Sequence, residues 1–193
     1  MLLEGISEED IETAPLTAFD DACEKISKTD ITITKHKFPI LEKLLSLASI
    51  IYTVEAYEVW GDLLEKEGKK MYPEILSRFM AGKNFTQNEY KNAWSSISSI
   101  RADWMNFTQE FDAVILQTSP ILPPNKTKLL SDSSYYKRAN LLALRNTRIG
   151  NMLGLCSITL PTSQPSCGFM IMGAPFSELK LLNIASKIEK DIT

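Results

Sequence analysis

The chain has 193 residues, 44% of them hydrophobic, which is enough for one domain with a substantial core; two domains are possible but not required, and nothing in the composition indicates disorder. Its formal net charge of −3, with lysine and arginine spread along the sequence, offers no basic stripe for a phosphate backbone, so we expect no nucleic-acid partner. The longest apolar tract, Phe38–Val54, is interrupted by Glu42 and Lys43, and the N-terminus lacks the features of a signal peptide, so we expect no membrane span and a cytoplasmic protein.

Residues 1–110 are predicted to be mainly helical. A helix is expected from about Pro15, which suits a first turn, to Ile26, because apolar residues repeat there at helical spacing. The β-branched alternation of Asp30–Lys37 predicts one short strand with a solvated face. Further helices are predicted from Ile40 to about Gly68, from Pro73 to Met80 with Gly82 as a left-handed cap, and from the capping box at Thr86 to about Phe107.

The pattern changes at Phe111. The continuous apolar run Ala113–Leu116 predicts a strand covered on both faces, and the prolines after it predict an extended loop to about Ser134. A helix from Tyr135 to about Asn151, strands at Cys156–Leu160 and Cys167–Met172, and a helix capped by Ser177 and running through Ile188 complete the expected elements.

This order of elements predicts an α/β fold, in which a helical layer is followed by a mixed sheet flanked by helices. We expect residues 1–193 to form a single domain, with residues 1–110 mainly helical and residues 111–193 supplying the strands and helices of the sheet core.

A search for catalytic or ligand-binding patterns finds little. His36 is the single histidine, and the three cysteines, Cys23, Cys156 and Cys167, have no paired ligand spacing, so no metal site is expected and the thiols are interpreted as reduced core residues. The eight glycines are isolated, which leaves no phosphate-binding loop, and no cofactor is expected. Ser133 and Lys137 could be read as a serine–lysine pair, but their position at a predicted helix start favours a cap.

The order of several segments nevertheless resembles one enzyme family. FDAVILQTSPILPP, then YYKRANLLALRNTRIGNMLGLCSITLP, then PSCGFMIMGAPFSELKLL are similar to the C-terminal part of the amidase signature family. Upstream, EAYEVWGDLL and YPEILSRFMAGKNFTQNEYKNA are similar to the helices that precede this part. The resemblance is to the bacterial branch that contains allophanate and mandelamide hydrolases. It covers essentially the whole chain, and it implies the corresponding part of the amidase fold.

The resemblance also implies what the chain lacks. The family hydrolyses amides with a lysine, a serine in a cis configuration and a serine nucleophile, and these serines lie in a glycine- and serine-rich segment. The sequence contains no Gly-Gly and no Gly-Ser pair, so no catalytic residue is carried over. What the resemblance does imply is a substrate-binding wall at Leu144, Asn146 and Ile149, with Thr118 and Ser119 near the same cavity. Packing explains Leu144 and Ile149 equally well, whereas Asn146 must find hydrogen-bond partners if it is buried.

Two readings of function stay open, besides the possibility that the chain is a fragment of a full-length enzyme. In the first, the chain is the C-terminal portion of an amidase-type carbon–nitrogen hydrolase and is inactive alone. In the second, it is a non-catalytic subunit or a decayed remnant that acts as a binding or structural partner. The expected partners are a separately encoded N-terminal amidase half, or a second copy that associates through an exposed apolar face.

Overall fold

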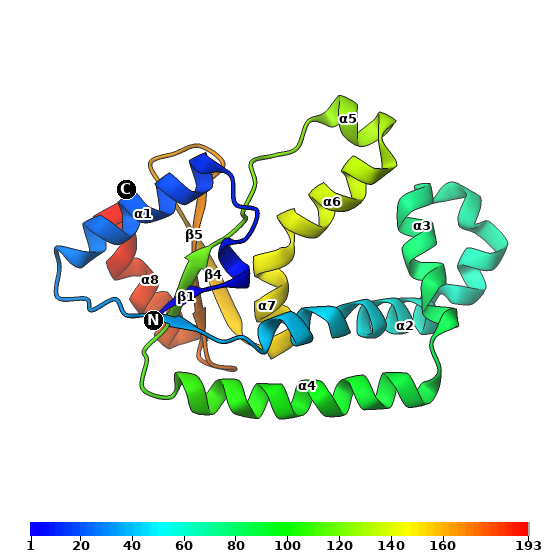
Figure 1. The fold of residues 1–193 in the computed structure, drawn as a ribbon, viewed down its shortest axis with the longest axis horizontal. Helices are drawn as coiled ribbons and strands as arrows, with labels where there is room; N and C mark the ends of the chain where they lie inside the picture. Colours follow the sequence, from blue (N-terminus) through cyan, green and yellow to red (C-terminus); the bar gives the residue numbers. More distant parts are fainter. Residues whose placement is uncertain (193) are drawn as a thin grey trace.

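The computed structural model describes residues 1–192 and contains one five-stranded mixed sheet flanked by helices (Figure 1). The strands lie in the order β2-β1-β3-β5-β4. β1 is parallel to β2 and β3, whereas β5 is antiparallel to both β3 and β4. The strands are β1 (Leu2–Glu4), β2 (Lys35–Lys37), β3 (Val114–Gln117), β4 (Cys156–Pro161) and β5 (Gly168–Gly173). The predicted mixed α/β class is confirmed.

Helices cover both faces of the sheet. Helices α1 and α8 pack on one face, and α2, α4 and α7 pack on the other. Helices α3, α5 and α6 extend away from the sheet above α2 (Figure 1). The α-helices are α1 (Thr13–Ser27), α2 (Leu41–Glu67), α3 (Pro73–Met80), α4 (Gln87–Thr108), α5 (Lys126–Ser131), α6 (Ser133–Ala143), α7 (Arg145–Leu153) and α8 (Glu178–Ile192). Short 3₁₀ helices occupy Ile6–Glu8, Gly68–Lys70 and Ala81–Asn84.

Alternation along the central strands divides the core into two clusters. Val114 and Leu116 of β3 pack with α2, α4 and α7, whereas Ile115 packs with α1 and α8. β3 is buried throughout, as the apolar run in its sequence predicts, because helices cover both of its faces. None of the helices in residues 1–192 is both long and apolar enough to cross a membrane.

The strand near residue 35 is shorter than predicted. Asp30–Lys37 is expected to be a strand, but only Lys35–Lys37 pairs, because its neighbour β1 offers just three residues, Leu2–Glu4. β1 itself has no alternating pattern and is not predicted, although it lies between β2 and β3 in the sheet. Residues 1–110 therefore contribute two strands to the sheet core as well as the helical layer.

Three further expectations need correction. Gly82 is not a left-handed cap; it lies in the 3₁₀ helix Ala81–Asn84, where a Cβ would come within 2.0 Å of the Thr53 carbonyl oxygen on α2. The predicted loop to Ser134 contains α5, which begins where the Asn125 side chain accepts a hydrogen bond from the Lys128 N–H. The helix predicted over Tyr135–Asn151 is divided at Leu144 into α6 and α7.

Candidate functional site

The carboxyl ends of β1 and β3 lie on the same side of the sheet, where the chain leaves each strand in a loop. The loop after β1 contains the 3₁₀ helix Ile6–Glu8, and the loop after β3 runs to α5. The first turn of α7 packs against both loops. In open α/β sheets, ligands bind outside the carboxyl ends of parallel strands, so the region beyond the carboxyl ends of β1 and β3 is the candidate site.

A buried polar cluster joins these three segments; we define it as Ser7, Gln117, Arg145 and Asn146, all buried. The Asn146 side-chain amide donates to the backbone oxygens of Gln117 (2.8 Å) and Ser7 (3.2 Å). The Arg145 guanidinium donates to the Ser7 oxygen (2.9 Å) and to the oxygen of Glu9. Arg145 Nε also donates to Asn146 Oδ1 (3.2 Å). The cluster therefore fixes the loop after β1 to the end of β3 and to α7.

Burial of this cluster affects the pKa of Arg145 and the hydrogen bonds available to its polar groups. Desolvation lowers the pKa of the Arg145 guanidinium from its ordinary value, while the nearby acids Glu9 and Asp10 act in the opposite direction. The donors of Arg145 and Asn146 are directed at backbone oxygens, which makes their role positional. One acceptor is left over: Gln117 Oε1 is buried and has no hydrogen-bond partner within residues 1–192.

The structure places the predicted wall residues in three different environments. Asn146 is fully buried in the polar cluster, and it holds the peptide that leads from Gln117 into Thr118 and Ser119. Ile149 is also fully buried, in the core with α2 and α4. Leu144 lies at the junction of α6 and α7 and is exposed. Asn146 is thus bonded to the peptide that precedes Thr118, whereas Ile149 lies in the apolar core.

A cavity of about 480 Å³ lies between the loop after β1, the loop after β3 and α6, and none of the four polar-cluster residues lines it. Its lining includes Asp10, Glu12, Tyr135 and Arg138. Arg138 and Asp10 form an ion pair at 3.4 Å, and the Glu12 carboxylate accepts from the Leu122 N–H at 2.8 Å. The volume is in the range of small-molecule sites. Sequence reasoning missed these residues and also Arg145; the one available signal was a pair of arginines, Arg145 and Arg148, within a helix of apolar periodicity.

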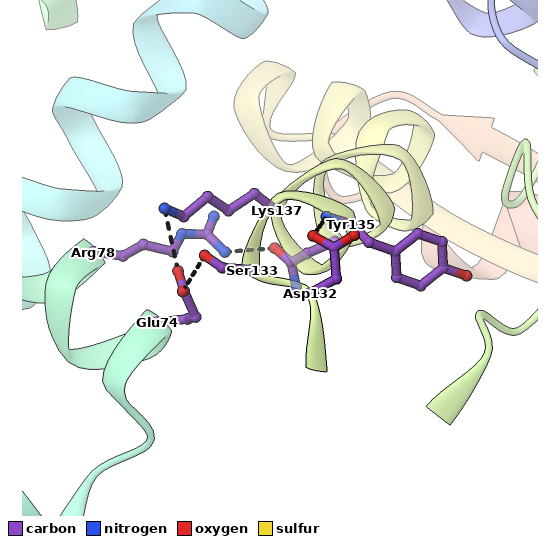
Figure 2. A network of polar contacts seen from close by, with 7 residues as sticks. Glu74, Arg78, Asp132, Ser133, Tyr135 and Lys137 are labelled. Carbon is purple, nitrogen blue, oxygen red and sulfur yellow. Dashed lines mark hydrogen bonds and ion pairs between the residues drawn. The ribbon is translucent and has the colours of Figure 1, made fainter. Parts of the chain in front are cut away.

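Ser133 and Lys137 do not form a serine–lysine pair (Figure 2). Ser133 donates to Glu74 Oε1 on α3 at 2.5 Å, and Lys137 forms an ion pair with the other oxygen of Glu74 at 3.5 Å. The cap expected of Ser133 is provided instead by the preceding residue: the Asp132 side chain accepts from the Tyr135 N–H, and Ser133 is the first residue of α6.

The fold and the site are those of a mixed α/β protein whose loops at the carboxyl ends of two parallel strands surround a buried polar cluster. The family follows from comparison with known proteins. Residues 2–182 match the family model described as Amidase, and the chain belongs to this family.

The relatives are considerably longer than this chain. The 2-amino-5-chloromuconic acid deaminase of Comamonas testosteroni is 21% identical over 187 residues, which cover 94% of this chain and 40% of the deaminase. Among solved structures, a Glutamyl-tRNA(Gln) amidotransferase subunit of Thermotoga maritima has a TM-score of 0.77 and 20% identity, and the match covers 99% of this chain and 42% of that one.

A further neighbour was solved in work on an unexpected vestigial protein complex and the evolutionary origins of an s-triazine catabolic enzyme. Its TM-score is 0.79 at 18% identity, and the match covers 98% of this chain and 42% of that chain. The chain thus spans about 40% of the length of these relatives.

Proposed function

We propose that this chain is the C-terminal portion of an amidase-type carbon–nitrogen hydrolase and that it does not hydrolyse amides alone. The observation that carries the proposal is the family match over residues 2–182 in a sequence without a Gly-Gly or Gly-Ser pair. In this family the nucleophile and its oxyanion-stabilising amides belong to a glycine- and serine-rich segment. A serine nucleophile needs an adjacent base and preorganised donors for the developing oxyanion, and their loss removes most of the catalysis.

In this proposal the chain supplies one wall of the substrate cavity. Asn146 positions the Thr118–Ser119 segment by holding the Gln117 carbonyl, and exposed Leu144 provides an apolar contact at the rim. Ile149 supports this wall from the core and does not touch substrate. The substrate class is an amide.

The second candidate is a non-catalytic subunit or decayed remnant that acts as a structural partner. The structural similarity to a protein from a vestigial complex favours it, as does the similarity to proteins named as amidotransferase subunits. Both candidates place the chain in the cytoplasm, a proposal that the three free thiols support.

The test is an amide-hydrolysis assay of the purified chain against simple aliphatic and aryl amides. We expect no turnover above that of a mock purification from the same host. The chain is then assayed together with a polypeptide from the same genome that matches the amidase family over the remaining portion. Turnover by the pair that disappears when the partner's nucleophilic serine is replaced by alanine supports the hydrolase. A complex without turnover favours the structural partner. Turnover by the chain alone that a serine-directed reagent abolishes would contradict the proposal.

A further inference from the structure

The two edge strands of the sheet differ in how well they resist the addition of another strand. β2 has three residues, Lys35–Lys37, and short strands with lysine are a common protection against edge pairing. β4, at the opposite edge, has six residues, Cys156–Pro161, and none of them is charged. Only the terminal Pro161 opposes pairing there. β4 is therefore the open edge.

The register of the strands shows which backbone groups of β4 face outward. The Gly168 carbonyl accepts from the N–H of Thr118, directly after β3, so Gly168 is directed toward β3. Direction alternates along a strand, so Met170 faces β3 as well, and its partner Thr159 on β4 forms the pair that is not hydrogen-bonded. The N–H and C=O groups of Thr159, and of Ser157 two residues earlier, therefore point away from β5 into the open edge.

An aromatic side chain stands in solvent close to this edge. Phe176 is 95% exposed, and its backbone has a φ of 60°, in the left-handed region that bulky residues avoid. It lies between Ala174 and Ser177, and both of these contact the Cys156 thiol at the start of β4, at 3.1 and 3.2 Å. Strained backbone persists where the surrounding structure enforces it, and it is common at functional sites.

The outer flank of α8 extends this apolar surface. Leu179 is 80% exposed, and Leu182, one turn further along, is also exposed. Lys180 marks the other flank, because its amine pairs with Asp112, just before β3, at 2.9 Å. At about 100° per residue, Leu182 is nearly opposite Lys180 and so faces away from β3, on the side of β4. We define the docking surface as the outward backbone of Ser157 and Thr159 together with the side chains of Phe176, Leu179 and Leu182.

We propose that the docking surface binds the portion of the amidase fold that the relatives carry outside the region matched here. A strand of that portion pairs with β4, and its apolar residues cover Phe176 and the outer flank of α8. The lengths of the relatives indicate this binding partner, since 98–99% of this chain aligns with the solved relatives but only 42% of each relative is matched. The open edge is the place where the sheet can continue, because β2 is protected. This inference rests on the proposed function and adds to it the surface through which the two portions meet.

The experiment uses the full chain and a polypeptide from the same genome that matches the amidase family over the remaining portion. The two are mixed, binding is measured by calorimetry, and amide hydrogen exchange is followed in the chain alone and in the complex. We expect a one-to-one complex in which the amides of Ser157 and Thr159 exchange at least about tenfold more slowly, because a new strand accepts their hydrogen bonds.

Three variants probe the docking surface. Thr159→Pro removes an outward N–H, Phe176→Gly removes the exposed ring and relieves the positive φ, and Leu179→Ser removes an apolar contact. Each should weaken binding at least about tenfold, which corresponds to about 1.4 kcal/mol. Leu130→Ser is the matched control, since Leu130 is 71% exposed on α5, far from β4 (Figure 1), and it should bind within about twofold of the unaltered chain. Phe176→Gly should unfold at or above the temperature of the unaltered chain, which separates docking from folding.

The outcomes distinguish this inference from the proposed function. A hydrolytically active complex that the three variants leave unchanged, or in which Ser157 and Thr159 stay unprotected, overturns the surface and leaves the proposed function standing. Pairing of two copies of this chain through β4 also overturns the surface assigned to the second portion. Absence of a complex overturns the surface, and a genome that encodes no such polypeptide overturns the surface and favours the decayed remnant.

Discussion

At the scale of single residues, Asn146 has the most demanding position in the chain. It is fully buried at the start of α7, and its amide reaches two backbone oxygens, those of Ser7 and Gln117, which lie on different loops. Buried carbonyl oxygens need donors, and the Ser7 oxygen has a second donor in Arg145. The Gln117 oxygen depends on Asn146 more strongly.

Replacement of Asn146 by leucine tests this role. Asn146→Leu keeps a similar volume but removes both donors, so we expect the free energy of unfolding in urea to fall by roughly 1–3 kcal/mol. Thr147→Ala on the same helix is the control, because the Thr147 hydroxyl bonds at the surface to Leu144, and it should change stability by less than about 0.5 kcal/mol. Equal effects of the two variants would show that the amide bonds carry no special weight.

At the scale of elements, α3 is attached to α6 through polar contacts. Glu74 on α3 receives the Ser133 hydroxyl and the Lys137 amine, and Arg78 donates to the Asn140 side chain at 2.5 Å (Figure 2). α3 packs along α2 without a fully buried residue, and these polar contacts link it to α6.

The pH dependence of this attachment follows from the pKa of Glu74. The Ser133 hydroxyl, and then Lys137, hold the pKa of the Glu74 carboxyl below its ordinary value of 4.5. A lowered pKa in the folded state means that the attachment is fully present above pH 4.5 and is lost as the pH falls through the lower folded-state value. Hydrogen exchange of the α3 amides, corrected for the intrinsic rate, should therefore accelerate by a factor of a few in acid.

Glu74→Gln is the matched control for this prediction. The glutamine cannot titrate, so its α3 amides should exchange at a corrected rate that does not change over the same pH range. An unaltered chain whose α3 protection is equally independent of pH would contradict the role given to Glu74.

At the scale of the whole molecule, one sheet joins the two core clusters. β1 comes from the first residues and lies between β2 and β3, so strands from residues 1–110 and from residues 111–192 pair in one sheet. We propose that the chain unfolds as a single cooperative unit, because neither cluster is covered without the sheet that separates them.

Two probes of urea unfolding test this proposal. Tryptophan fluorescence reports on the cluster around buried Trp104 of α4, and far-ultraviolet circular dichroism reports on all helices, including α1 and α8 on the other face. The two transitions should have the same midpoint and slope. Separate transitions would show two independent units.

The sequence alone determined the elements whose signals are local. The capping box of Thr86 and Glu89 begins α4 where predicted, since both of its hydrogen bonds lie within four residues. The apolar runs of β3 and β5 were also found, because strands covered on both faces have few polar residues. The family resemblance rests on the same kind of information, the order of local segments along the chain.

Tertiary structure decided the features that depend on residues far apart in the sequence. β1 could not be found because three residues show no period, and the length of β2 is set by its pairing with β1. Arg145 meets Ser7 across 138 positions, and Gly82 is required by the approach of Thr53, so neither role is visible locally. The same holds for the edge at β4: its apolar sequence indicates a strand, but only the order of the sheet shows that one side of this strand is left unpaired.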